Sequence, residues 1–128
     1  MWTYIQALKD TLSKLDGVKT CKVGIEPTLN ADSYPMIRIV PSEINPVADH
    51  YSRRTMTVLI YFGANNYESQ VGMEEVEHQL FLMEQKIRDN CNVGAGFKPQ
   101  FFKTYFDESR LQESFRVMCL ILKVTGEG

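Results

Sequence analysis

The sequence lacks several features that mark particular classes of protein. Its three cysteines, Cys21, Cys91 and Cys119, are too few and too far apart for a disulfide framework or a C-x-x-C zinc site. No apolar run approaches the roughly 20 residues of a membrane-spanning helix, and the first residues do not have the pattern of a signal peptide. We therefore expect reduced cysteines, no membrane partner, and a chain that stays in the compartment where it is made.

An excess of charge of one sign is also missing. The chain has 14 basic and 16 acidic residues, for a net charge of −2. Without a summed positive field to hold a phosphate backbone, we expect no specific nucleic-acid binding. Glycine, proline and apolar residues occur at ordinary frequencies for a globular protein, which predicts a single domain over residues 1–128 with one core.

Motifs for catalysis and cofactor binding are absent from the sequence. Neither a phosphate-binding G-x-x-x-x-G-K-[ST] loop nor a G-x-G-x-x-G fingerprint occurs. Asp49 and His50 have serines nearby, but no G-x-S-x-G turn presents a nucleophile. His78 follows Glu74 and Glu75 at helical spacing, yet the sequence supplies no third ligand for a metal. We predict a protein that is not an enzyme, with no catalytic residues, no metal site and no cofactor.

Hydrophobic periodicity predicts an α+β fold. Apolar residues at steps of three and four predict helices over residues 2–16 and 70–90. Alternation and β-branched runs predict strands over residues 18–25, 36–40, 53–62, 101–106 and 113–125. The expected order is αβββαββ, a mixed and mainly antiparallel sheet of about five strands packed with two helices. The strand over 53–62 has the most continuous apolar run, so we place it in the centre of the sheet.

The last predicted strand is apolar on both of its faces. Phe115, Val117, Cys119 and Ile121 face one way, and Met118, Leu120, Leu122 and Val124 face the other. We expect more apolar surface here than two helices can cover, so a second copy of the chain is expected to cover the rest. The candidate interface residues on this strand are Met118, Leu120 and Leu122.

Residues 42–52 show neither period and contain several turn-forming residues, which predicts an exposed loop of the kind that often carries function. Asp49 and His50 in this loop are further interface candidates. Arg53 and Arg54 follow at the junction with the central strand, where a guanidinium could pair with a carboxylate of another subunit.

The second-last predicted strand carries paired aromatics with a basic neighbour, in Phe101-Phe102-Lys103 and Tyr105-Phe106. Such residues stack on bases in some sheets that bind single-stranded RNA. The acidic residues that follow and the net charge favour core packing and a subunit contact instead.

In its chain length and order of elements, this sequence resembles the tail terminator and neck (tail-completion) proteins of long-tailed bacteriophages. The resemblance extends from the opening helix (Trp2 to Leu15) through the three strands and the second helix (Met73 to Ile87) to the closing strands. It implies a structural virion-assembly protein, a homo-oligomer that commonly forms a hexameric ring on the tail tube. The implied partners are the tail tube protein and a head-side connector protein. The implied location is the virion and the cytoplasm of an infected or lysogenic bacterial host.

Two other interpretations remain open. A small-molecule-binding or enzymatic domain with a ferredoxin-like fold would have a pocket between the second helix and the sheet, but that plan usually begins with a strand. A bacterial adaptor or secretion-tube component similar to tail proteins would assemble by the same physics.

Overall fold

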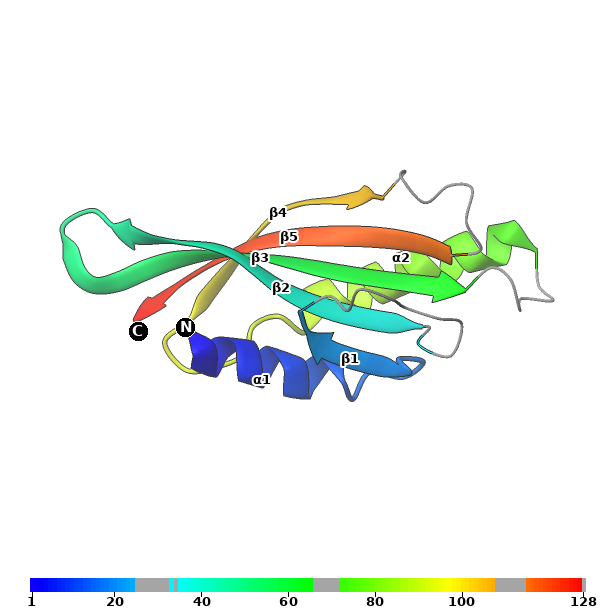
Figure 1. Ribbon diagram of the computed structural model, residues 1–128, viewed down its shortest axis with the longest axis horizontal. Coiled ribbons are helices and arrows are strands. Elements are labelled where there is room, and N and C mark those ends of the chain that lie inside the picture. The colour runs from blue at the N-terminus through cyan, green and yellow to red at the C-terminus, as the bar shows by residue number, and fades with distance from the viewer. Residues whose placement is uncertain (25–32, 34, 66–71, 108–114, 128) are drawn as a thin grey trace.

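The computed structural model describes residues 1–24, 33, 35–65, 72–107 and 115–127 (Figure 1). The predicted α+β class and the order αβββαββ are confirmed. The elements are α1 (Trp2–Leu12), β1 (Thr20–Val23), β2 (Met36–Val47), β3 (His50–Asn65), α2 (Met73–Asp89), β4 (Lys98–Phe106) and β5 (Phe115–Glu127).

The five strands form one mixed sheet in the order β1-β2-β3-β5-β4. Strand β1 runs parallel to β2, and all other neighbours are antiparallel. The centre of the sheet is β3, as its apolar sequence predicted. In its register, Ile60 lies between Ile39 of β2 and Leu120 of β5. The last two strands, β4 and β5, are antiparallel neighbours, and residues 108–114 between them lie outside the described residues.

Both helices pack on the same side of the sheet, which we call the helix face; the opposite side is the helix-free face. Figure 1 shows α1 beside β1 and α2 passing behind β3 and β5. The apolar stripe of α1 is buried, and it joins inward-facing residues of α2, β2, β3 and β5 in one continuous core. Helix α1 ends at Leu12, four residues before the predicted end, and Gly17 at φ 88° lies in the turn that leads to β1.

The predicted loop over residues 42–52 is wrong, because β2 and β3 continue through it as a long hairpin. Strand β2 does not end at Val40, as predicted, but extends to Val47, and β3 begins at His50. Proline is tolerated here because, among the described residues, β1 pairs only with residues 36–39 of β2, and none of them pairs with the outer edge of β2 beyond Ile39. Register shifts between Pro41 and Glu43 and between Pro46 and Val47 accommodate both prolines. The hairpin extends to one end of the molecule in Figure 1.

No helix in the described part of the chain is long and apolar enough to cross a membrane.

Candidate interaction surfaces

Three of the predicted interface residues lie in the core. Met118, Leu120 and Leu122 point to the helix face and are only 4%, 1% and 0% exposed. They belong to the same cluster as the inward-facing residues of α1 and α2. The prediction that these side chains meet a second copy is therefore wrong for the folded protomer, because the two helices already cover them.

The other face of β5 also retains little apolar surface. Val117 and Cys119 point to the helix-free face and are buried within the single chain, while Ile121 is half-buried. Val117 packs with Met36 of β2 and Tyr61 of β3 in a small second cluster. The expectation that this strand leaves one apolar face uncovered is thus also wrong. Any interaction surface has to be sought elsewhere.

One row of side chains crosses the whole helix-free face. The strand register places Lys22, Arg38, Tyr61, Cys119 and Tyr105 side by side, one from each strand. The Nη1 group of buried Arg38 donates hydrogen bonds to the β1 strand and to the carbonyl oxygen of its own neighbour, at 2.8 to 3.3 Å. These bonds tie β1 to the rest of the sheet.

The environment of the Cys119 thiol in this row favours its protonated form. Burial raises the pKa of the Cys119 thiol, although hydrogen bonds with Tyr105 and Tyr61 act in the opposite direction. The hydrogen bond with Cys119 is also the main cause that raises the pKa of Tyr105. A protonated and buried thiol is a poor nucleophile, and the pairing of Cys119 with Tyr61 and Tyr105 joins strands β3, β5 and β4 on this face.

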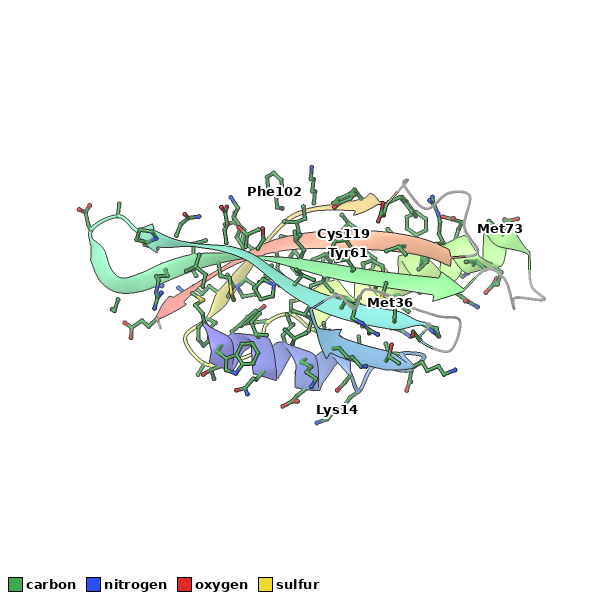
Figure 2. The ribbon with its side chains drawn as sticks, viewed as in Figure 1. Lys14, Met36, Tyr61, Met73, Phe102 and Cys119 are labelled. Carbon is green, nitrogen blue, oxygen red and sulfur yellow. The ribbon has the colours of Figure 1, made fainter. Side chains whose placement is uncertain are left out.

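Exposed aromatic side chains gather instead on the edge strand β4. Phe102 is 64% exposed, and Figure 2 shows it at the outer edge of the sheet. Two lysine ammonium groups, those of Lys103 and Lys123, lie 5.7 Å from the centre of its ring. Lys103 lies at the same distance from the ring of Tyr105, which is also exposed. We call Phe102, Lys103, Tyr105 and Lys123 the aromatic-lysine patch.

The patch belongs to the helix-free face. Lys103 and Tyr105 pair with Ile121 and Cys119, and Lys123 follows the same alternation along β5. A register shift between Phe101 and Lys103 makes Phe102 an extra residue in the strand, which turns its ring outward.

A second exposed surface lies on the opposite layer, on α2. Its outward residues combine carboxylates with large apolar side chains: Glu74, Glu75, His78, Phe81 and Leu82. Phe81 is 58% exposed although its ring makes an edge contact with Phe106 of β4, at 5.9 Å between centroids. We call these five residues the outer face of α2.

An ion pair fixes the orientation of this helix. Arg116 of β5 donates from Nε to Oε1 of Glu77 at 2.8 Å, and its guanidinium lies 4.2 Å from the centre of the Phe106 ring. Glu77 is thus held toward the sheet, on the same side of α2 as the buried Val76 and Leu80, and the opposite side of the helix faces outward.

The remaining predicted interface residues lie along the long hairpin. Asp49 is at its tip, exposed and in the left-handed region with φ 66°. His50 begins β3. Arg53 and Arg54 lie where the hairpin meets the end of β5, opposite Glu127 and Gly126, and Arg54 is exposed. The structure places these four residues at the other end of the register from Met118 and Leu120, the predicted interface residues of β5 that pair with Phe62 and Ile60.

A hollow of about 270 Å³ lies between α2 and the turn after α1. Its lining combines apolar side chains such as Leu15, Val18 and Met83 with the polar Asp16, Gln79 and Lys86. The ferredoxin-like alternative expected a pocket between the second helix and the sheet, and this hollow lies at the edge of that helix instead.

Among the described residues, no three His, Cys, Asp or Glu side chains form a group that could hold a metal ion. The nearest arrangement is the exposed pair of His78 Nδ1 and Glu75 Oε2, 4.0 Å apart on α2.

No protein-family model matches this sequence, and comparison with curated proteins also finds no match. A function for this chain therefore has to come from its own residues and their arrangement.

The sequence indicates part of the aromatic-lysine patch. The paired aromatics of residues 101–106 suggest a subunit contact, but sequence reasoning did not place Lys123 beside them. Lys123 is the charged residue in an otherwise apolar stretch of β5, and this charge marks where the helix-free face becomes exposed. On α2 the signal is weaker, because Phe81 and Leu82 fall outside the apolar stripe and only their exposure in the structure makes them part of an outer surface.

Proposed function

We propose that this chain is a structural assembly protein that forms an oligomeric ring at the end of a phage tail tube and connects it to the head-side connector. The proposal rests on the resemblance in element order and chain length, together with the surfaces that the protomer exposes. The proposed ring is a hexamer, and its proposed partner at the tail end is the tail tube protein.

The observation that carries the proposal is the pair of exposed surfaces on opposite layers. The aromatic-lysine patch lies on the helix-free face of the sheet. The outer face of α2 lies on the opposite side of the molecule, in the helix layer. A closed ring requires a head-to-tail contact, which uses two different surfaces of each subunit. A symmetric dimer would need only one self-complementary surface.

The long hairpin supports the proposal independently. Its β2 arm is exposed from Pro41 to Pro46, including the apolar Ile44. Only its tip, residues 47–52, extends beyond the end of β5 as two strands. A short two-stranded tip has little core of its own, so contact with a neighbour or with a tube subunit would stabilise it. Arg53 and Arg54 at its base remain candidates for such a contact.

The test is assembly measured on the purified full-length chain. Size-exclusion chromatography with light scattering, from low micromolar to near-millimolar concentration, is expected to show a defined oligomer whose mass is a multiple of the protomer. If the chain alone stays monomeric, it is mixed with polymerised tail tube protein from the same genome, and co-sedimentation is measured. A chain that remains a monomer at every concentration and does not sediment with tubes would refute the proposed function.

A further inference from the structure

We infer that the aromatic-lysine patch of one copy is covered by the outer face of α2 of the next copy. The inference rests on the proposed function, because it identifies the two surfaces that a head-to-tail contact would join.

The two surfaces are complementary in charge. The patch presents the ammonium groups of Lys103 and Lys123, both exposed. The outer face of α2 presents the carboxylates of Glu74 and Glu75 near its amino end, also exposed. Opposite charges on facing surfaces set the register of a contact and accelerate encounter, whereas like charges strongly disfavour it.

The surfaces are also complementary in their apolar content. Phe102 and Tyr105 on the patch are exposed aromatics, which are enriched at the centres of protein interfaces. Phe81 and Leu82 lie about two turns beyond the glutamates of α2 and are exposed as well. Each surface therefore combines two charged groups with two large apolar side chains.

The edge strand β4 is poorly suited to the alternative contact, in which a partner strand extends the sheet. The register shift at Phe101 and Lys103 interrupts its edge, and Pro99 removes one backbone donor. Contact through side chains on the face of the sheet is thus favoured over strand addition.

The layer arrangement prevents a protomer from making this contact with itself. Helix α2 packs on the helix face of its own sheet, and the patch lies on the opposite face. Figure 2 shows Phe102 at the edge of the sheet and Met73, at the start of α2, near one end of the molecule. A helix from the next copy would cover the exposed rings of Phe102 and Tyr105 on the helix-free face and give the sheet a helix on both faces.

Two charge-reversal variants test the contact. Lys103→Glu/Lys123→Glu makes both surfaces acidic, and Glu74→Lys/Glu75→Lys makes both basic. Each variant alone is expected to lose association by about tenfold or more, because every contact would join like charges. When the two variants are mixed in equal amounts, each contact joins opposite charges again, and association should return to within about threefold of wild type. Because the two variants must alternate around a ring, only rings with an even number of subunits can close.

A matched control changes charge elsewhere by the same amount. In Lys9→Glu/Lys14→Glu, the first residue lies on α1 and the second just after its end, and both are exposed. Figure 2 shows Lys14 far from Phe102, so this variant is expected to associate like wild type. Thermal unfolding by circular dichroism checks that all variants remain folded. Association is measured by light scattering, or on tubes if the wild type assembles only there.

The outcomes separate the inference from the proposed function. If the wild type assembles and the reversal variants assemble equally well, or if mixing restores nothing, the inference is wrong and the proposed function stands. If the wild type neither assembles nor binds tubes, the proposed function itself fails. If Lys103→Glu/Lys123→Glu abolishes binding of a fluorescent 20-nucleotide oligo(dT) but leaves assembly intact, the patch serves nucleic acid and the inference is overturned.

Discussion

Replacing Leu122 by alanine distinguishes a core role for β5 from the interface role that the sequence suggested. The Leu122 side chain is fully buried on the helix face and pairs with Val58 of β3 and Phe101 of β4. The change removes three carbons, which at about 0.8 kcal/mol each gives roughly 2.4 kcal/mol of lost transfer free energy. The unfilled cavity adds to this, so we expect a total of about 3 kcal/mol, within the range of roughly 2–5 kcal/mol for such sites.

The assay is equilibrium unfolding in urea, followed by far-UV circular dichroism. With a slope of roughly 1.5 kcal/mol per molar urea, a loss of about 3 kcal/mol lowers the midpoint by about 2 M. The protein is held at low micromolar concentration, and the midpoint is shown not to depend on that concentration, because assembly would add to the apparent stability.

The adjacent residue provides the control. Lys123→Ala changes an exposed side chain on the opposite face, so its unfolding midpoint should correspond to a change of no more than about 0.5 kcal/mol. Association should instead weaken if the patch is an interface. The opposite pattern, in which Leu122→Ala leaves the midpoint unchanged but prevents assembly, would show that our placement of the β5 faces is wrong.

Three further changes test other parts of the structure. Tyr4→Phe removes the hydroxyl that donates to the Cys91 carbonyl oxygen at 2.7 Å, and the buried acceptor left behind should lower the free energy of unfolding in urea by about 1–3 kcal/mol. Gly126→Ala places a methyl group against the Phe97 ring, so we expect a similar urea experiment to show a loss of about 1–3 kcal/mol, and Phe97→Leu in the same chain should recover part of it. Burial raises the pKa of the Cys91 thiol from 9.0 to about 12, so above about pH 9 the unfolded chain releases a proton that the folded chain keeps. The free energy of unfolding should then fall with rising pH by up to about 1.4 kcal/mol per unit, and a Cys91→Ala variant with the same steep fall would contradict this cause.

The long hairpin illustrates what the residues near one another in sequence could not decide. Pro41 and Pro46 indicate a break in any strand whose two edges are paired, and this rule led to the prediction of a loop. The rule does not apply to β2 beyond Ile39, because in the described part of the chain no strand pairs with its outer edge there and β1 ends at Val23. Only the pairing of distant segments reveals which edge a proline occupies.

The two faces of β5 are a second feature that local sequence could not fully predict. Alternation correctly separated Met118, Leu120 and Leu122 from Val117 and Cys119. It did not tell which set the helices cover, and the candidate interface was assigned to the set that lies in the core.

The sequence by itself determined the α+β class, the order of the seven elements and the central place of β3, because these follow from local periodicity and from the apolar content of each segment. Tertiary structure alone decided where the remaining exposed apolar surface lies. Burial depends on which elements cross each face of the sheet. It was the packing of both helices on one side that left the aromatic-lysine patch and the outer face of α2 exposed on opposite layers.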